Sequence, residues 1–230
     1  MKLSQVSEQI KGRDPVDSIR TLCDLFPGKV VFTTSFGIED QVISHLIFKN
    51  DLPVKVITLD TGRLFEETYK VFSNTLKLYN KKIDVYYPDT TELESLLSEK
   101  GPYSFYNSIE ERKECCNIRK VHPLNRALEG MQIWITGIRS QQSTGRTDMS
   151  DLEEDSGRNM LKYHPLFDWS LEDVETFLKD NNIPYNSLHN KGYISIGCAP
   201  CTRPVKEGED FRAGRWWWEN NSGKECGLHK

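Results

Sequence analysis

The stretch Lys29-Val-Val-Phe-Thr-Thr-Ser-Phe-Gly37 decides the fold class of this chain. Its first six residues form a short run rich in β-branched side chains, which is typical of a buried strand. The next three, Ser35-Phe36-Gly37, indicate a tight turn. The residues that follow repeat apolar side chains at helical spacing, at Val42, Ile43, Leu46 and Ile47. The stretch therefore predicts a strand, a turn and a helix in succession.

The same alternation continues outward from this stretch. Further strands are predicted at residues 54–59, 83–87 and 132–136, with helical stretches at about 64–79, 91–99 and 109–128 between them, and a helix at 16–26 precedes the first strand. Because strands alternate with helices, we expect an α/β fold whose parallel sheet is flanked by helices.

The second half of the chain carries weaker structural signals. Residues 140–157 are polar and predict a long loop, and Ser170-Leu-Glu-Asp173 is a capping box that begins a helix ending near 179. Regular structure is hard to assign from 184 to 230, and no linker or repeat interrupts the chain. We therefore expect one domain over residues 1–230, of which about 205–230 form a mobile C-terminal tail.

Composition and charge exclude several classes of protein. The chain has 230 residues, of which 37% are hydrophobic, enough for a real core, and its net charge is −4. This acidic balance argues against a nucleic-acid binder. No apolar run approaches the ~18 residues of a membrane span. The N-terminus lacks the apolar core of a signal peptide, which favours the cytoplasm.

Three of the predicted strands end in turns that contain glycine and polar residues. The turns are 35–37, 60–62 and 137–139. In a parallel sheet, ligands bind beyond the carboxyl ends of the strands, where glycine lets the backbone come close and a helix N-terminus offers free N–H groups. The three turns favour a nucleotide-like ligand, although any such fold also needs ordinary turns at these places.

The six cysteines are the most informative residues in the sequence. Cys115-Cys116 and Cys198-Ala-Pro-Cys201 supply four soft ligands, which zinc and iron–sulfur clusters both accept. Neighbouring side chains on a helix diverge by about 100°, and this divergence favours a bulky cluster over one small ion. Disulfide pairing and coincidence are the alternatives, and both are uncommon in a cytosolic chain.

Two further cysteines stand apart from these pairs. Cys23 falls on the apolar face of the helix at 16–26, which predicts core packing. Cys226 lies near the C-terminus between Gly223 and Gly227. With cations nearby, its thiolate would be a nucleophile, and the alternative is a tail cysteine without a role.

Several motifs together resemble one enzyme family. They are Ser-Phe-Gly-Ile-Glu-Asp-Gln at 35–41, Leu-Asp-Thr-Gly at 59–62, Cys-Cys at 115–116 with Lys120, Thr-Gly-Ile-Arg at 136–139, Tyr-Asn-Ser-Leu-His at 185–189, Gly-Tyr-Ile-Ser-Ile-Gly-Cys-Ala-Pro-Cys-Thr-Arg-Pro at 192–204, Gly-Arg-Trp-Trp-Trp-Glu at 214–219 and Glu-Cys-Gly-Leu-His at 225–229. In these motifs the chain resembles adenylyl-sulfate reductases, the cluster-containing type related to phosphoadenylyl-sulfate reductase.

The resemblance implies a fold, a cofactor and a nucleophile. The fold is the adenine-nucleotide α-hydrolase-like α/β type, although Ser35-Phe-Gly-Ile-Glu-Asp40 lacks the lysine that pyrophosphate-cleaving relatives carry in this loop. One [4Fe–4S] cluster per chain is implied on Cys115, Cys116, Cys198 and Cys201, and Cys226 matches the catalytic nucleophile.

The resemblance also implies an activity and a set of substrate contacts. The enzyme would reduce adenosine 5′-phosphosulfate to sulfite and AMP, in the sulfate assimilation that leads to cysteine biosynthesis, through a Cys226 S-sulfocysteine released by thioredoxin or a similar dithiol. Arg146 is assigned to a phosphate contact, although Gly145-Arg146-Thr147 departs from the Thr-Arg pair of relatives. The implied substrate-binding residues are Ser35, Gly37, Leu59, Asp60, Thr61, Lys120, Gly137, Arg139, Arg146, Arg212, Arg215 and His229.

Other functions compete with this interpretation. A phosphoadenylyl-sulfate reductase, or an enzyme with dual specificity, would use the same chemistry on a substrate with a 3′-phosphate. A non-catalytic zinc or iron–sulfur redox module would leave the strand-end turns and Cys226 without a role. A sulfur transferase acting on RNA conflicts with the acidic balance. Neither a nucleic acid nor a membrane is expected as a partner, and a homo-oligomer is compatible with the sequence.

Overall fold

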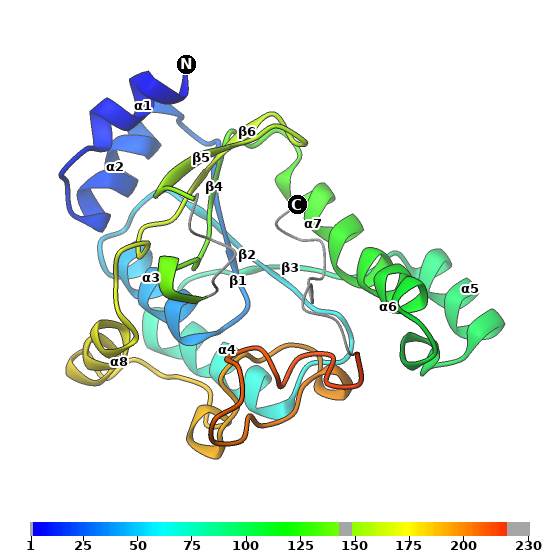
Figure 1. The fold of residues 1–230 in the computed structure, drawn as a ribbon. Coiled ribbons are helices and arrows are strands. Elements are labelled where there is room, and N and C mark those ends of the chain that lie inside the picture. Colours follow the sequence, from blue (N-terminus) through cyan, green and yellow to red (C-terminus); the bar gives the residue numbers. More distant parts are fainter. Residues whose placement is uncertain (1, 143–148, 220–230) are drawn as a thin grey trace. The chain divides into compact units, whose positions relative to one another are not determined.

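A six-stranded, mostly parallel sheet organises the chain (Figure 1). The structure is a computed structural model that describes residues 2–142 and 149–219. The strand order is β3-β2-β1-β4-β6-β5. β1 pairs in parallel with β2 and β4, β4 pairs in parallel with β6, and β5 is antiparallel to β6. The strands are β1 (Val30–Thr34), β2 (Lys55–Leu59), β3 (Asp84–Tyr86), β4 (Ile133–Ile135), β5 (Leu152–Asp155) and β6 (Met160–Tyr163). The expected α/β fold is confirmed.

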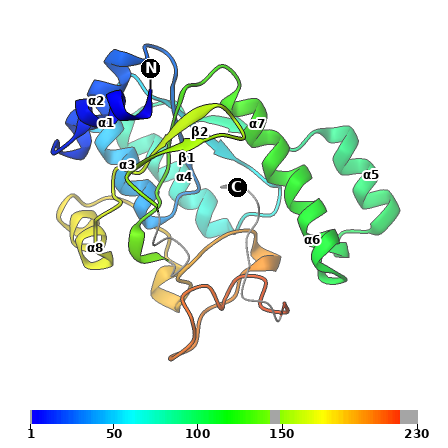
Figure 2. The ribbon, with the colours of Figure 1, turned by 45° about the horizontal axis from the view of Figure 1, so that its top comes forward.

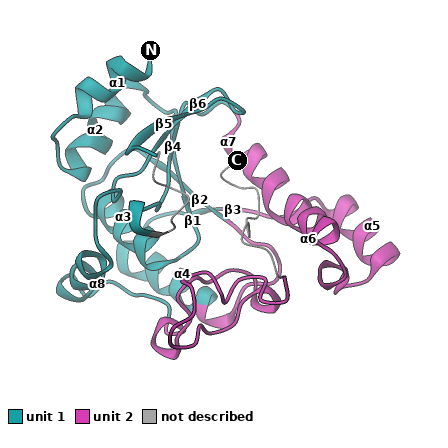
Figure 3. Ribbon diagram, in the orientation of Figure 1, with its two compact units in different colours: residues 1–58, 68–84, 130–186 teal, residues 59–67, 85–129, 187–230 magenta. Residues whose placement is uncertain are grey.

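The chain divides into two compact units, which Figure 3 colours separately. Unit 1 comprises residues 1–58, 68–84 and 130–186, and it holds most of the sheet. Unit 2 comprises residues 59–67, 85–129 and 187–230. Each unit has its own cluster of buried side chains, so each is described separately.

Unit 1 packs helices against the sheet. Its core joins alternate residues of β1 and β4 with the apolar side of α3, for example Phe32, Ile135 and Ile43, all of which are fully buried. Figures 1 and 2 both show α3 beside α8. Cys23 is 4% exposed in this core, as predicted. The helices are α1 (Leu3–Ile10), α2 (Pro15–Leu25), α3 (Ile38–Lys49), α4 (Glu66–Tyr79, from Thr68 on in this unit) and α8 (Leu171–Asp180).

Local sequence signals explain where these helices begin. Asp14 precedes α2, and its carboxylate accepts hydrogen bonds from the N–H groups of Val16 and Asp17. Ser170 and Asp173 form the predicted capping box of α8. These side chains satisfy N–H groups that have no partner inside the helix.

Unit 2 is built from helices and short turns around a second buried cluster. The cluster contains Leu96, Phe105, Trp216 and four cysteines. The helical segments are α5 (Thr90–Lys100), a 3₁₀ turn (Ser104–Tyr106), α6 (Ile109–Cys116), a π-helical turn (Asn117–Val121), α7 (His122–Leu128) and two further 3₁₀ turns (His189–Lys191 and Ala199–Cys201). None of the helices in the described ranges 2–142 and 149–219 has the length and apolar character needed to cross a membrane.

The single helix predicted at 109–128 contains a change of helical type. After Cys116 the backbone widens into the π-helical turn, in which the His122 N–H donates to the Asn117 carbonyl. Pro123 follows, and it has no N–H to donate to an α-helical partner. Turns of this kind change the direction in which later side chains point and are frequent at functional sites. The π-helical turn begins immediately after the two adjacent cysteines.

The loop predicted at 140–157 was partly wrong, because β5 lies within it. Acidic residues are poor strand formers, so Leu152-Glu-Glu-Asp155 gave no strand signal. In the structure, ion pairs offset the cost of placing an acid in this strand. Asp155 is buried and forms ion pairs with Arg158 at 2.8 Å and Lys162 at 3.1 Å. A strand that depends on such partners cannot be recognised from its own residues.

Candidate active site

Four cysteines from two distant segments line one cavity in unit 2. Cys115 and Cys116 are the last two residues of α6, whereas Cys198 precedes the 3₁₀ turn at Ala199–Cys201 and Cys201 ends it. All four are buried and face the same cavity. The structure therefore brings together the two pairs that the sequence singled out.

Hydrogen bonds fix the turn that carries the second pair. The Cys201 N–H donates to the Cys198 carbonyl at 2.9 Å, and the Thr202 hydroxyl donates to the same oxygen at 2.9 Å. The Gly197 N–H donates back to the Thr202 hydroxyl at 3.2 Å. This local network holds Cys198 and Cys201 on one side of a tight turn.

Basic side chains surround the sulfur atoms. The described residues that line the cavity include no carboxylate, and its basic members are Arg63, Arg112, Arg119 and Lys120. Lys120 and Arg215 both act electrostatically on Cys198 and Cys201. A buried group of positive charges of this kind favours thiolates over thiols.

The individual thiols respond differently to this environment. Burial raises the pKa of Cys198, but Lys120 and a contact of 3.3 Å from the Thr61 hydroxyl outweigh it, so the pKa of Cys198 is lowered overall. Burial and the neighbouring Cys198 raise the pKa of Cys201 to about 12. Burial also raises the pKa of Cys115. Of these three thiols, only that of Cys198 has a lowered pKa.

The donor set of this cavity consists of cysteine sulfurs, which are ligands of soft metal centres. Cysteine sulfur is the ligand that zinc and iron–sulfur clusters share. A single zinc ion requires its sulfurs at about 2.3 Å from one point. Among the residues that the structure describes, no three His, Cys, Asp or Glu side chains form a group that could hold one ion. In the described part of the chain, the four sulfurs face one cavity without being gathered around the position of one ion.

Arg215 and Trp216 extend this region toward the C-terminal part of unit 2. Gly197 leaves room for Arg215, because a Cβ atom at 197 would lie 2.3 Å from the Arg215 Nη2. The Arg215 guanidinium carbon lies 4.8 Å from the centre of the Trp216 ring, a cation–π distance. Trp216 is buried and Trp218 packs on Tyr106 with ring centres 4.4 Å apart, whereas Trp217 is exposed. Two of the three tryptophans thus anchor this segment.

In unit 1, the turn after β1 is organised by a buried acid. Asp40, in the first turn of α3, accepts hydrogen bonds from the Ser35 N–H at 2.6 Å and the Ser35 hydroxyl at 2.7 Å. Burial raises the pKa of Asp40 to about 6, although the bonds from Ser35 oppose the shift. A Cβ atom at Gly137 would lie 2.4 Å from the Asp40 Oδ1. Glycine is therefore required at the end of β4. Gly37 is the N-cap residue of α3.

Arg139 is bound by its own unit. It is 2% exposed, and its Nε donates to the Glu39 carboxylate at 2.9 Å while Nη1 donates to the Trp169 carbonyl at 3.3 Å. Two of its donor groups thus have protein partners. These bonds link the end of β4 to the beginning of α3, so Arg139 supports the turn at Ser35 as well as being a predicted contact.

The turn after β2 belongs to unit 2 and faces the cysteines. Leu59 ends β2 and is partly buried. The Asp60 carboxylate accepts a hydrogen bond from the Gly62 N–H at 2.8 Å, which closes the turn. The Thr61 carbonyl accepts one from Arg119 Nη1 at 2.6 Å, and its hydroxyl contacts Cys198. Thr61 therefore contacts the cysteine cavity, a role that the sequence did not indicate.

The remaining predicted site residues lie in different parts of the chain. Lys120 lines the cysteine cavity, as described above. Arg212 is partly buried, and its N–H donates to the Asp210 carboxylate at 2.8 Å. Arg146, Cys226 and His229 lie outside the residues that the structure describes.

Sequence reasoning missed four residues that shape these sites. They are Asp40, Arg63, Arg112 and Arg119. A weak signal existed for two of them, since Asp40 lies inside the quoted motif at 35–41 and Arg119 follows Cys115 and Cys116 by one helical turn. The other two are recognisable only from the long-range packing of unit 2.

Comparisons with known proteins match most of the chain to one family. Residues 29–204 match the family described as phosphoadenosine phosphosulfate reductase domain. An adenosine 5′-phosphosulfate reductase from Sinorhizobium fredii strain USDA 257 is 50% identical over 88% of this chain and 80% of the relative. The enzyme of the same name from Neisseria meningitidis serogroup B is 48% identical over 86% of this chain and 81% of the relative.

Solved structures give the same answer for the fold. A phosphoadenylyl-sulfate reductase from Candida auris, solved as a phosphate complex, matches with a TM-score of 0.73 and 25% identity, covering 88% of this chain and 96% of that one. The FMN adenylyltransferase of Candida glabrata matches with a TM-score of 0.56 and 14% identity, over 99% of this chain and 83% of that one. The second likeness concerns the fold alone.

Proposed function

The chain belongs to the phosphoadenosine phosphosulfate reductase family, and on that premise we propose that it reduces adenosine 5′-phosphosulfate to sulfite and AMP. It is an oxidoreductase that acts on a sulfur group. The proposed substrate follows from relatives of 45–50% identity, which are named for this nucleotide. The observation that carries the proposal within this chain is the convergence of four buried cysteines and several cations on one cavity.

The first half of the reaction uses Cys226 as the nucleophile. Its thiolate attacks the sulfate sulfur, a bond forms between the two sulfur atoms, and the bond between that sulfur and the phosphate oxygen breaks. AMP leaves with the electron pair of the broken bond. The product is an S-sulfocysteine on the enzyme.

The second half requires a dithiol partner, for which we propose thioredoxin. One thiolate of the partner attacks the Cys226 sulfur and displaces sulfite, which carries away the electron pair of the bond between the two sulfurs. The second thiol of the partner then attacks the mixed disulfide and releases Cys226. The partner ends as a disulfide, and its two electrons account for the reduction of sulfate to sulfite.

The substrate contacts of this proposal are assigned from the sequence pattern, and the residues of each unit are taken by themselves. In unit 1 we assign Ser35, Gly37 and Gly137 to the ribose and phosphate groups, because the turn after β1 is held open by Asp40. In unit 2 we assign Lys120, Arg212 and Arg215 to the phosphosulfate charge. The remaining assignments, from the sequence pattern, are Leu59, Asp60, Thr61, Arg139, Arg146 and His229.

The charged groups of unit 2 assist the chemistry by electrostatics. Two negatively charged reactants, a thiolate and a phosphosulfate, must approach each other. Lys120 and Arg215 act electrostatically on the cysteine region, and we assign both to the phosphosulfate as well. Fixed positive charges of this kind stabilise the charge that develops on the leaving phosphate.

A [4Fe–4S] cluster is the cofactor that we propose for the cysteine cavity. Cys115, Cys116, Cys198 and Cys201 would hold it, and their soft sulfur donors with nearby cations fit that role. When bound, the cluster supplies local order and electrostatics without a change of redox state. Arg63 and Arg119 offset the negative charge of the thiolates.

The alternative substrate carries a 3′-phosphate. The likeness to the Candida auris phosphoadenylyl-sulfate reductase favours it, but at 25% identity that relative is about half as similar as those named for the unphosphorylated substrate. We therefore propose adenosine 5′-phosphosulfate as the preferred substrate and the cytoplasm, where dithiols are kept reduced, as the location.

A Cys226→Ser variant tests the proposal. On protein loaded with iron, it should still bind adenosine 5′-phosphosulfate, and it should release neither AMP nor sulfite. Mass spectrometry of the wild-type protein, after one turnover without thioredoxin, should find one added SO₃ group on the peptide that contains Cys226. Sulfite formation by Cys226→Ser at the wild-type rate would contradict the assignment.

A further inference from the structure

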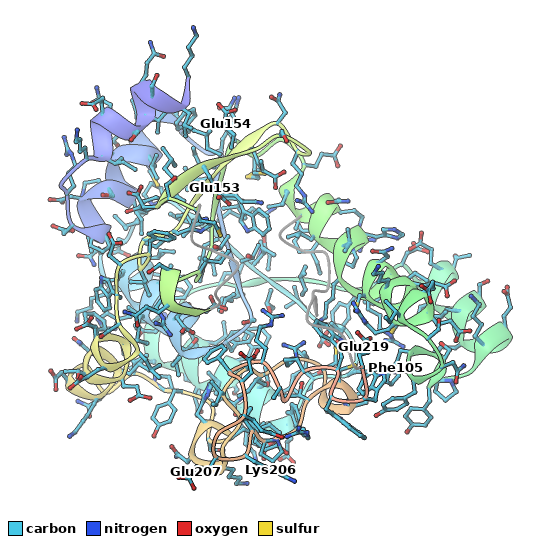
Figure 4. The ribbon with its side chains drawn as sticks, in the orientation of Figure 1. Phe105, Glu153, Glu154, Lys206, Glu207 and Glu219 are labelled. Atoms are coloured by element: carbon cyan, nitrogen blue, oxygen red, sulfur yellow. The ribbon has the colours of Figure 1, made fainter. Side chains whose placement is uncertain are left out.

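Arg112 and Glu219 form a buried, two-pronged ion pair in unit 2. Arg112 Nε donates to Glu219 Oε1 at 2.7 Å, and Arg112 Nη2 donates to Glu219 Oε2 at 2.9 Å. The side chains are only 1% and 3% exposed. Figure 4 labels Glu219 and also Phe105, whose ring lies 5.9 Å from that of Trp218. The carboxylate therefore enters the interior of the unit.

The pair holds a strained segment against α6. Arg112 also places its guanidinium 4.7 Å from the centre of the Trp216 ring. Trp216 has a φ of 42°, a conformation that side chains other than glycine rarely adopt. The Glu219 N–H donates to the Trp216 carbonyl, and the Trp216 N–H donates to the Cys201 carbonyl. Residues 216–219 thus form a tight turn fixed to both cysteine segments.

The position of the pair in the chain gives it a consequence for catalysis. Arg112 lies one helical turn before Cys116, a ligand of the proposed cluster. Glu219 lies seven residues before Cys226. Seven residues span at most about 25 Å when fully extended, so the place where Glu219 is fixed limits where the thiol can act.

The energetics argue that the pair has a role other than stability. Removing two charges from water costs several kcal/mol per ion, and well-packed apolar residues often stabilise a protein equally well or better. What a two-pronged arginine–carboxylate pair supplies is a single defined geometry. A defined geometry at residue 219 is what the delivery of a reactive thiol requires, because a misplacement of about 1 Å can cost about 100-fold in rate.

We propose that Arg112 and Glu219 are positioning residues that set the starting point of the segment carrying Cys226. The proposal rests on the proposed role of Cys226 as the nucleophile. It makes the step in which Cys226 attacks the substrate depend on the pair. Arg112 also lines the cysteine cavity, but neither member of the pair is a sulfur donor or an assigned substrate contact, so we expect iron and substrate to bind without the pair.

The test compares Glu219→Gln with Glu209→Gln, each on protein loaded with iron. Glu209 makes a similar two-pronged pair with Arg203 at 2.7 and 3.0 Å, but that pair is partly exposed and does not involve α6. The measurements are iron content, the dissociation constant of adenosine 5′-phosphosulfate and the single-turnover rate of AMP release. We expect Glu219→Gln to keep its iron, bind substrate within about two-fold of wild type and release AMP about 10- to 100-fold more slowly, whereas Glu209→Gln matches wild type.

A double variant, Arg112→Gln with Glu219→Gln, separates positioning from folding. It removes both charges, so no unpaired charge remains buried, and we expect iron to be retained with AMP release still slow. Normal AMP release by either variant overturns the proposal. Loss of iron from both variants also overturns it, because the pair would then support the cysteine cavity. If the wild type itself releases no AMP, the proposed function has failed instead.

Discussion

The turn after β1 in unit 1 and the cysteine region in unit 2 each place a glycine against a buried charged side chain, which is an acid in unit 1 and a cation in unit 2. In each, a glycine leaves space for a buried ionic side chain: a Cβ atom would lie 2.4 Å from Asp40 at Gly137 and 2.3 Å from Arg215 at Gly197. The acid is tied by hydrogen bonds to its own loop, whereas the cation lies beside thiols.

This difference separates two ways of building a binding site. Asp40 shapes a backbone turn, and in our proposal this turn offers neutral donor groups to the nucleotide. Arg215 contributes positive charge beside the thiols, and in our proposal it also binds the phosphosulfate. We therefore expect unit 1 to respond to changes in shape and unit 2 to respond to changes in charge and in sulfur donors.

The largest effect is expected from Cys198→Ser. Loss of one sulfur donor should remove iron, inorganic sulfide and the brown colour, and activity should fall to background, because the other three cysteines then face the cations without a complete ligand set. Metal analysis and visible spectroscopy check this.

Cys23→Ser is the matched control for that prediction. Cys23 is buried in the core of unit 1, and burial raises the pKa of its thiol to about 11, so it should keep its iron. A colourless wild-type protein that holds one zinc ion would contradict the cluster.

Gly137→Ala should have the next largest effect. The new methyl group must displace the Asp40 carboxylate, which two hydrogen bonds from Ser35 hold in place. Overpacking of this kind costs about 1–3 kcal/mol of unfolding free energy. We expect iron content to stay normal while nucleotide binding weakens about 10-fold or more, as calorimetry can measure. Unchanged binding would show that the turn does not contact the nucleotide.

Gly197→Ala should lower stability less than Gly137→Ala does, and it should displace the positive charge of Arg215. The methyl group meets the far end of a flexible arginine, which can move at little cost. We expect the unfolding free energy to change by less than about 1 kcal/mol, and KM for the nucleotide to rise about 10-fold as Arg215 leaves its place. Gly157→Ala, where the nearest atom is 3.5 Å away, is the control. Equal kinetics for the two variants would remove Arg215 from the site.

The smallest effect is a pH dependence that Asp40→Asn should abolish. The pKa of Asp40 is raised from 3.8 to about 6, so the folded state favours the protonated acid. Its contribution to stability is complete below about pH 3.8 and is lost as the pH rises through about 6. Urea unfolding should therefore show wild type losing about 1 kcal/mol relative to Asp40→Asn between pH 5 and pH 8. A difference that does not vary with pH would contradict the buried acid.

The sequence predicted those features that depend on local pattern. The β-branched run before Ser35 identified the first strand, and the paired cysteines at 115–116 and 198–201 identified the cavity. Both signals come from residues that lie close together in the sequence. Local pattern was therefore enough for the fold class and for the main chemical group.

The features that the sequence did not predict depend on contacts between distant residues. An acid such as Asp40 in the first turn of a helix is ordinarily solvated, whereas here it is buried and Gly137, distant in the sequence, approaches it closely. The pairing of Arg112 with Glu219 joins residues that are 107 positions apart. Such partners have no periodic signal, because the fold alone decides which charges meet.

The most direct test of the proposed function is the release of sulfite from two nucleotides. Protein loaded with iron is given reduced thioredoxin and either adenosine 5′-phosphosulfate or its 3′-phosphorylated form, and sulfite and AMP are measured together. We predict equal amounts of sulfite and AMP from adenosine 5′-phosphosulfate, at a kcat/KM well above that for the 3′-phosphorylated nucleotide. No sulfite from either nucleotide, or a preference for the 3′-phosphorylated one, would contradict it.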